Sequence, residues 1–461
     1  MENAEQTEVL VIGAGVAGLI AARDLASGGL RVVLLEARGR IGGRMLTRRP
    51  IGDPSVELGP EFVHGENPVL TGLVKESGIQ LVDSPAKQWV VSDRGMQSRD
   101  DLWDRLAEVM KRIDAQEFSS FGAWLKNGAT SIVPEDRVQA REFVQNFHAG
   151  SVDSVSAKIL KETTGGTEDE QQRVNNGYDR IPLTLAEQAY AAGVAIELNS
   201  VVKTIRWEPG AATVEAATGG GFEKKIYRAK AVVITLPLGV LKAVPGQLGA
   251  IAFEPELTEK RTLWELLPFG FVTRITLRFR DSFWNEPFVP PPMRKASGKD
   301  FGFLHAPGAP VPVWWSSSPA PVLIGWAGGP ASRALAGRTT EDMVQAGLRS
   351  LADALGCSFP ALREALVESY QHDWSADPFC RGGYSFAVAG LEDAPSRLAE
   401  AVENTLFFAG EATAEPAELG TVGGALDSGV RVAKEVLRAV RTDAQKISAP
   451  NPSNDGASGT K

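Results

Sequence analysis

The sequence predicts a protein of combined α/β and α+β class, in which a discontinuous Rossmann-like domain is joined to a second domain with a mixed or antiparallel sheet and a helical insert. Three observations support this class. A glycine-rich strand-turn-helix segment occupies residues 8–44, apolar residues recur at helical spacing between about 84 and 170, and longer strand-like segments begin at about residue 253.

The segment near the N-terminus has the order of a βαβ unit. Apolar runs at 9–12 and 32–35 predict two buried strands, and the pattern at 16–25 predicts the helix between them. Strands that are apolar along their whole length are typical of a parallel sheet covered on both faces. The unit therefore predicts the first part of a doubly wound domain.

Three glycines and one acid give this unit a ligand-binding pattern. Gly13 permits the tight turn, Gly15 lets the backbone approach a pyrophosphate, and Gly18 lets the helix pack closely on the strand. Glu36, at the end of the second strand, suits two hydrogen bonds from a ribose hydroxyl pair and would repel a 2′-phosphate. The unit predicts a bound dinucleotide and disfavours NADP.

Composition narrows the classes of function. The chain has 461 residues, a hydrophobic fraction of 43% and a net charge of −9, which allow two or three domains and argue against a nucleic-acid partner because no basic stripe is present. The first residues, MENAEQTE, lack the basic start of a signal peptide, and no apolar run suits a membrane span. Cys357 and Cys380 give no disulfide framework, and the histidines follow no metal-ligand spacing. We expect a cytoplasmic protein without metal.

Four later segments carry a resemblance to a known family. GRIGGR begins at Gly39, ELGPEFVHG at Glu57, HDWSADPFCRGGYSFAVAG at His372 and LFFAGEATAE at Leu406. In this order after the first unit, they resemble the flavin-dependent amine oxidases, the family of monoamine oxidases, polyamine oxidases and flavin histone demethylases, in a bacterial-type soluble form. The resemblance covers nearly all of residues 8–441 and implies FAD as the cofactor.

The resemblance implies cofactor contacts along the whole chain. Arginines of GRIGGR suit forked bonds to phosphate, and the helix that follows Glu411 would direct its N-terminus at the flavin N1 edge. Mammalian monoamine oxidases bind the flavin covalently through a cysteine, whereas Gly383 stands there in this chain and Cys380 comes three positions earlier. We therefore expect non-covalent FAD. The implied cofactor-binding residues are Gly13, Gly15, Gly18, Glu36, Ala37, Arg38, Gly43, Arg44, Gly59, Pro60, Glu61, Val202, Trp374, Gly410, Glu411, Thr421 and Val422.

The resemblance also implies four catalytic residues. Tyr384 matches the aromatic residue over the flavin face, and Thr421 matches the second wall of the substrate cage. His64 matches a position that faces the amine in polyamine oxidases, and it equally fits a hydrogen-bonded structural histidine. Arg274 stands where most relatives carry a lysine that holds a water near flavin N5. Because arginine stays cationic, a reoxidation through such a water is put in doubt.

The same order of segments predicts the domain boundaries. We expect residues 1–83, 175–250 and 395–445 to form the FAD-binding domain. Residues 84–174 would form the helical part of the substrate domain and 251–394 its sheet-containing part, and 446–461 would be a disordered tail.

Within these parts, the sequence predicts a strand at 196–207 and a helix at 340–355 that ends before a glycine. Most aromatic residues of the helical part are expected to fill its core, as is usual for such residues. They are Phe118, Phe121, Trp124, Phe143 and Phe147.

The resemblance implies oxidation of an amine C–N bond by hydride transfer to flavin N5, giving an imine that water hydrolyses and, with O2, hydrogen peroxide. An L-amino-acid oxidase is the first alternative, since Arg274 or an arginine of the helical part would suit a substrate carboxylate. A desaturase or protoporphyrinogen-type oxidase shares the N-terminal motifs, and a scaffold with a structural FAD is the least favoured. The particular amine, the electron acceptor, and the choice between monomer and homodimer stay open.

Overall fold

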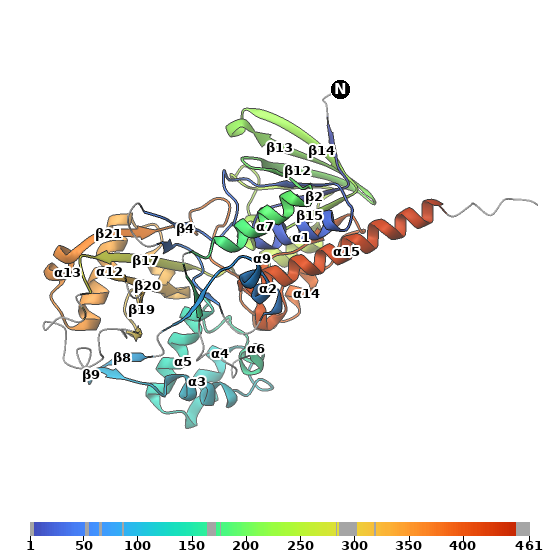
Figure 1. The fold of residues 1–461 in the computed structure, drawn as a ribbon. Coiled ribbons are helices and arrows are strands. Elements are labelled where there is room, and N and C mark those ends of the chain that lie inside the picture. Colours follow the sequence, from blue (N-terminus) through green and yellow to red (C-terminus); the bar gives the residue numbers. More distant parts are fainter. Residues whose placement is uncertain are drawn as a thin grey trace, which may run out of the picture.

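The structure is a computed structural model that describes residues 4–50, 55–63, 67–84, 87–163, 172–175, 177–282, 284, 302–317 and 320–448. Three regions are visible in Figure 1: stacked sheets with long helices on the right, a second sheet with its own helices on the left, and a group of helices below. Parallel and antiparallel sheets occur together with helices, so the predicted fold class is confirmed.

A parallel five-stranded sheet lies in the first region, in the order β11-β3-β2-β15-β22. Side chains of β2 alternate between its two faces: Val9 and Val11 pack among helices, while Leu10 and Ile12 pack toward a second sheet. This double burial explains why the strand is apolar throughout. The strands are β2 (Val9–Ile12), β3 (Val32–Leu35), β11 (Ala195–Glu197), β15 (Ala231–Ile234) and β22 (Leu406–Phe408), and the helices are α1 (Val16–Ser27), α2 (Pro68–Glu76), α7 (Arg180–Ala191) and α15 (Val422–Ser448).

The second sheet of this region has the order β1-β14-β13-β12-β16 and covers the other face of the parallel sheet. Its last strand, β16, pairs with β12, and Trp264 of α9 packs against Phe408 of the parallel sheet. Residues 252–266, which were predicted to belong to the sheet-containing part of the substrate domain, therefore pack in the first region, with the parallel sheet. The elements are β1 (Glu5–Gln6), β12 (Val201–Glu208), β13 (Ala211–Thr218), β14 (Glu223–Ala229), β16 (Ala252–Glu254), α8 (Leu238–Leu241), α9 (Thr258–Leu266) and α14 (Ala394–Ala399).

The predicted strand at 196–207 is wrong as a single element. Asn199 has a φ of +53°, a backbone conformation that asparagine tolerates, and its N–H donates to the Arg38 carbonyl at 2.9 Å. The chain turns there, so β11 joins the parallel sheet and β12 joins the second sheet.

The left-hand region is a seven-stranded sheet in the order β21-β17-β20-β19-β18-β8-β9, antiparallel except between β18 and β8. Two of its strands, β8 and β9, come from the predicted helical part 84–174, so that part is not all helical. Helix α12 begins and ends as predicted, with Thr339 as its N-cap and Gly356 at its C-terminus. The elements are β8 (Gln88–Ser92), β9 (Gly95–Ser98), β17 (Val272–Phe279), β18 (Phe303–His305), β19 (Val313–Ser316), β20 (Val322–Gly328), β21 (Leu366–Gln371), α11 (Gly329–Leu335), α12 (Thr340–Leu355) and α13 (Phe359–Ala365).

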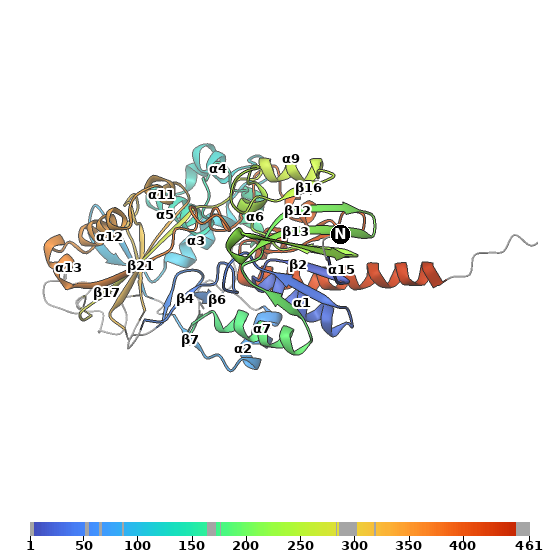
Figure 2. The ribbon, with the colours of Figure 1, turned by 90° about the horizontal axis from the view of Figure 1, so that it is seen from above.

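Helices form the lower region, which Figure 2 shows from above between the other two. Phe121 and Trp124 are fully buried in its core, as predicted, whereas Phe143 and Phe147 line a cavity. Its helices are α3 (Leu102–Lys111), α4 (Phe121–Asn127), α5 (Pro134–Phe147) and α6 (Ala157–Thr163). Two small sheets outside this helical group are formed by β4 (Thr47–Arg48) with β5 (Val56–Glu57), and by β6 (Phe62–Val63), β10 (Gln172–Val174) and β7 (Leu81–Asp83).

The C-terminal helix extends beyond the predicted limit at residue 445. It continues to Ser448, so the predicted disordered tail cannot begin at 446. Residues 449–461 lie outside the described part of the chain.

Candidate active site

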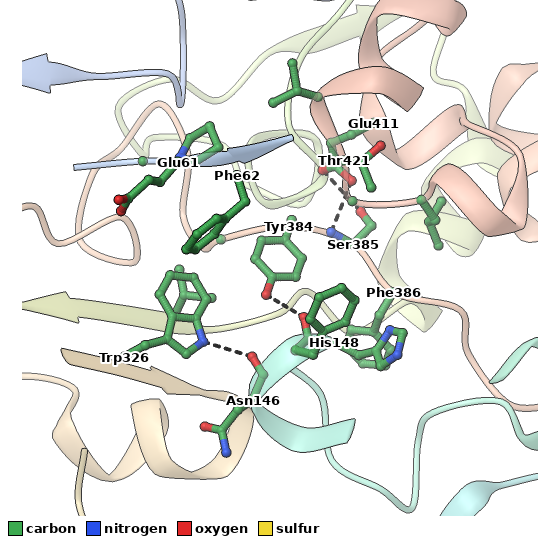
Figure 3. A pocket seen from close by; sticks show the side chains of 18 of the residues that line it. Glu61, Phe62, Asn146, His148, Trp326, Tyr384, Ser385, Phe386, Glu411 and Thr421 are labelled. Atoms are coloured by element: carbon green, nitrogen blue, oxygen red, sulfur yellow. Dashed lines mark hydrogen bonds between the residues drawn. The ribbon is translucent and has the colours of Figure 1, made fainter. Parts of the chain in front are cut away.

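A single cavity of about 520 Å³ is lined by all three regions. Its wall includes the glycine turn at Gly15, the segments of Arg44 and Glu411, and helices α3, α5 and α6. In Figure 3, Tyr384 lies between Phe62 on one side and the end of α5 on the other. The glycine turn and the aromatic residues thus share one space.

The glycine turn has the geometry of a dinucleotide cradle. Gly13 has a φ of +105°, and its N–H donates to the Leu35 carbonyl at 2.8 Å. A Cβ on Gly18 would lie 1.9 Å from the Gly13 carbonyl oxygen, so α1 packs directly on the turn. A Cβ on Gly15 would meet nothing within 4 Å, which leaves space beside the backbone at the N-terminus of α1. The turn therefore fits a pyrophosphate approaching Gly15.

Glu36 is buried and held at the edge of this turn. Its two carboxylate oxygens accept from the backbone N–H groups of Ala14 at 2.8 Å and Arg38 at 2.9 Å. Arg38 pairs with Asp377 at 2.7 Å. Each Glu36 oxygen keeps a second lone pair for a ribose hydroxyl. Predicted cofactor residues that do not line the cavity are Gly13, Gly18, Glu36, Ala37, Arg38, Gly43 and Val202.

Arg44 and Glu411 form an ion pair on the cavity wall. Nη1 of Arg44 donates to Glu411 Oε1 at 2.8 Å and to the Gly383 carbonyl at 2.7 Å. The other carboxylate oxygen of Glu411 accepts from the Ser385 N–H at 3.1 Å. Three segments distant in sequence are therefore fixed together here. The predicted cofactor residues that line the cavity are Gly15, Arg44, Gly59, Pro60, Glu61, Trp374, Gly410, Glu411, Thr421 and Val422.

The N-terminus of α15 also borders the cavity, at Val422. The Thr421 hydroxyl oxygen accepts from the Gly424 N–H at 2.9 Å, which caps the helix. Its proton is directed at Glu418, whose carbonyl and carboxylate lie at 2.8 and 2.9 Å. Thr421 thus lines the cavity with its hydroxyl already bonded, and the positive helix end favours a negative charge nearby.

Tyr384 projects from the loop before α14 toward α5. Its hydroxyl donates to the Phe147 carbonyl at 2.7 Å (Figure 3), and burial raises the pKa of the phenol above its ordinary value. Tyr384 is therefore neutral at physiological pH. Trp374 lies nearby in the same buried cluster and donates to the Leu58 carbonyl at 2.8 Å. Cys380 is buried in that cluster and does not line the cavity.

Arg274 is buried and paired with Glu61. Its Nη2 donates to Glu61 Oε2 at 2.6 Å, and Trp315 donates to the same oxygen at 3.2 Å. Arg173 lies 3.4 Å from the other oxygen. Burial alone would raise the pKa of the Glu61 carboxyl, but the charges of both arginines hold it below its ordinary value. Glu61, predicted as a cofactor residue, is thus the counter-ion of two arginines.

Two buried arginines share this one carboxylate. The Nε atoms of Arg173 and Arg274 have no hydrogen-bond partner among the described residues. Glu57 lies close enough to be affected by the charges of Arg274 and Glu61, but burial raises its pKa to about 7. Among the described residues, two arginines therefore face one carboxylate whose pKa is lowered and a second whose pKa is raised, next to the wall formed by Glu61 and Arg274.

Sequence reasoning missed several residues of the cavity. His148, at the end of α5, projects beside Phe386 in Figure 3, and Trp315 and Trp326 of the seven-stranded sheet complete an aromatic wall. The positions of the two tryptophans depend on strand pairing and that of His148 on the packing of α5, so no local pattern could indicate them. His64, predicted as catalytic, lies outside the described residues.

The described residues show neither a metal-binding cluster nor a membrane-spanning helix. They contain no group of three or more His, Cys, Asp or Glu side chains that could hold a metal ion. No helix among them combines the length and apolar character needed to cross a membrane.

One known family shares its sequence pattern with most of this chain. Residues 16–437 match the model described as flavin containing amine oxidoreductase. The chain belongs to this family. The match begins directly after Gly15 and includes Gly18, the ion pair of Arg44 with Glu411, and Tyr384, so most of the segments that build the cavity lie within the family's own pattern.

Curated relatives include histone demethylases and polyamine oxidases. The chain is 31% identical to lysine-specific histone demethylase 1 homolog 2 of Oryza sativa subsp. japonica, covering 94% of the chain and 57% of that protein. It is 28% identical to polyamine oxidase 4 of the same organism, covering 95% of the chain and 90% of that protein. The chain thus spans only about half the length of several demethylases that it matches.

Solved structures support the same fold. Putrescine oxidase bound to putrescine matches with a TM-score of 0.77 at 22% identity, covering 95% of this chain and 100% of that one. Cyclohexylamine oxidase from Brevibacterium oxydans matches with a TM-score of 0.74 at 20% identity, covering 94% and 99%. At this identity the likeness concerns the fold.

Proposed function

We propose that this protein is an FAD-dependent amine oxidase that converts a small-molecule amine to an imine and produces hydrogen peroxide. One observation carries the proposal: the glycine cradle and the aromatic chamber around Tyr384 are parts of one cavity. A dinucleotide whose pyrophosphate lies at Gly15 would extend along the wall of Arg44 and Glu411 toward Tyr384. The family membership supports the same assignment.

The chain's residues would hold the cofactor from several sides. Glu36 would accept from the ribose hydroxyls, the N–H groups after Gly15 would bind the pyrophosphate, and the N-terminus of α15 at Val422 would favour negative charge on the flavin ring. FAD, when bound, supplies the acceptor for the electron pair of the amine and passes it to O2. We propose non-covalent binding, because Gly383 offers no thiol and Cys380 lies away from the cavity wall.

The aromatic wall would bind and orient the amine. Tyr384 is fixed by its hydrogen bond to the Phe147 carbonyl, and Trp326 is fixed by donating to the Asn146 carbonyl at 2.9 Å. Rings held in this way exclude water and present a π-face to the amine nitrogen. Arg274, paired with Glu61, would act as a fixed positive charge, because an arginine retains its proton.

The arginine cluster favours a second candidate, an L-amino-acid oxidase. The surplus positive charge of Arg173 and Arg274 over Glu61 would suit a substrate carboxylate. We rank it second because the guanidinium of Arg274 that reaches the wall is already bonded to Glu61.

The remaining properties are proposals of the same kind. The net charge of −9 supports a small-molecule substrate over nucleic acid. We propose a cytoplasmic protein that is a monomer or a homodimer. Gel filtration combined with light scattering would distinguish the two states.

The deciding experiment is an anaerobic screen for loss of the visible flavin absorbance. The purified protein, yellow with FAD, is mixed with monoamines, polyamines and α-amino acids in separate samples. We expect amines to bleach the flavin. Bleaching by α-amino acids alone would favour the second candidate, and protein that neither contains nor takes up FAD would overturn the proposal.

The variant Tyr384→Ala supplies the control for the aromatic wall. It removes the ring and its hydrogen bond to Phe147 while leaving the glycine cradle intact. We expect slower reduction with the FAD still bound. Unchanged reduction kinetics would remove Tyr384 from the amine site.

A further inference from the structure

The chamber beyond Tyr384 is built mainly from apolar side chains. Leu102 and Leu106 of α3 and Ile159 and Leu160 of α6 line it, and Phe386 closes another side. Phe386 is buried, and its ring packs tightly against Gly150. A Cβ added to Gly150 would lie 2.8 Å from that ring. Such walls favour an apolar substrate group over water.

His148 is the exception in this wall. Its ring lies 5.3 Å from the Phe147 ring and 6.1 Å from the Phe143 ring, both edge to face. It lines the cavity, and its nitrogens have no hydrogen-bond partner among the described residues. Burial lowers its pKa to about 4, and no charged neighbour contributes to the shift. The imidazole is therefore neutral at physiological pH, with one donor and one acceptor unused.

We propose that His148, together with Phe147 and Phe386, forms a distal subsite that binds the uncharged, hydrogen-bonding end of an aromatic monoamine. The amine group would lie at Tyr384, and the aromatic tail would extend among the apolar side chains to His148. This inference rests on the proposed function and assigns the substrate class of the same site.

The carboxylates of the cavity explain why a second cationic group is disfavoured. Glu61 and Glu411 are already paired with arginines. Burial raises the pKa of Glu142 and of Glu418, and each is bonded to its own wall, Glu142 to Asn146 and Glu418 to Thr421. Among the described residues, an ammonium at the far end would therefore meet only carboxylates that are paired with arginines or that burial disfavours in the ionised form, so burying it would cost free energy.

The test compares three amines on FAD-loaded protein: tyramine, phenethylamine and putrescine. We expect kcat/KM to be about three- to tenfold higher for tyramine than for phenethylamine. This ratio corresponds to the net contribution of one hydrogen bond, made by the tyramine hydroxyl. We expect putrescine to be at least about tenfold poorer, because its second ammonium would be unpaired. Anaerobic titrations that follow the shift of the flavin bands give dissociation constants without turnover.

Three variants assign the effect to the imidazole. His148→Phe keeps the aromatic surface and should abolish the advantage of tyramine over phenethylamine, in binding as in turnover. His148→Gln keeps a donor and an acceptor and should restore part of it. Arg141→Gln, on an exposed position of the same helix, should preserve the full advantage.

The outcomes separate this inference from the proposed function. If amines reduce the flavin but His148→Phe keeps the tyramine advantage, or putrescine is the best substrate, the subsite is wrong and the oxidase stands. If no amine reduces the flavin but tyramine binds in a His148-dependent way, the subsite stands and the oxidase fails. Absence of both binding and reduction overturns both.

Discussion

The two ends of the cavity are built in different ways. At the glycine cradle, the contacts are between backbone atoms: the Gly13 N–H bonds to Leu35, and Gly18 lies against the Gly13 carbonyl. In the chamber, the contacts are between side chains from distant segments, as in the ion pair of Glu61 with Arg274. At Gly18 the cradle has no room for an added carbon, whereas the chamber depends on the balance of buried charge.

This difference determines how each end should fail. In the cradle, a single carbon added at Gly18 would overlap with the backbone and disrupt its packing. A chamber that contains buried arginines fails when one partner of an ion pair is removed, because the remaining charge has lost its partner.

The largest effect is expected at the cradle, from Gly18→Ala. The added Cβ would lie 1.9 Å from the Gly13 carbonyl oxygen, so strand and helix would have to separate. We expect loss of bound FAD and a fall in the free energy of unfolding of more than about 4 kcal/mol. FAD content and urea unfolding measure the two effects.

Gly72→Ala in α2 is the matched control for that variant. A Cβ there meets nothing within 4 Å, and alanine favours a helix over glycine by about 1 kcal/mol. We expect unchanged FAD content and equal or higher stability. If both glycine variants bound FAD normally, steric closeness would not define the cradle.

The strand, turn and helix of the cradle lie where the sequence predicted them. Gly13, Gly15, Gly18 and Glu36 lie within one short stretch of chain, so their spacing carries the local geometry. The prediction of a single strand at 196–207 was wrong because the backbone turns at Asn199. Asparagine tolerates the left-handed conformation but does not require it, so the sequence does not indicate a turn there.

The second expected effect is in the chamber, from Glu61→Gln. The amide keeps the size of the side chain but leaves Arg274 and Arg173 without a counter-ion. We expect the free energy of unfolding to fall by about 3–5 kcal/mol, measured in urea at neutral pH.

Glu368→Gln is the control for this ion pair. Glu368 pairs with Arg278 on the same strand as Arg274, at 3.3 Å and with the carboxylate half exposed. Exposed pairs contribute little, so we expect a change of at most about 1 kcal/mol. Equal losses in the two variants would contradict the view that buried charge determines the stability of the chamber.

The chamber shows why sequence reasoning missed part of the site. The resemblance indicated Glu61 and Arg274 separately, and neither position predicted that they pair with each other. Arg173 reaches them from β10, and His148 enters from the end of α5. Such contacts arise from tertiary packing between distant segments, so no regular spacing of residues in the sequence indicates them.

The smallest expected effect lies at Glu57, a buried carboxyl that interacts with the charges of Arg274 and Glu61. Its oxygens accept from the Thr47 hydroxyl at 2.8 Å and the Tyr178 N–H at 3.0 Å, and burial raises its pKa to about 7 from 4.5. The Glu57 carboxyl therefore loses its proton less readily in the folded protein than in the unfolded chain. Stability from this group is complete below about pH 4.5 and is lost as the pH rises through about 7.

Unfolding of wild type and Glu57→Gln at about pH 5 and about pH 8 tests this coupling. We expect the wild type to lose about 1–3 kcal/mol relative to the variant over that range. The charge of Glu61 contributes to the raised pKa of Glu57, so the same pH series in a Glu61→Gln background should show a smaller loss. An unchanged loss there would mean that the charge of Glu61 does not help to set the pKa of Glu57, and that the charge balance of the chamber does not extend to Glu57.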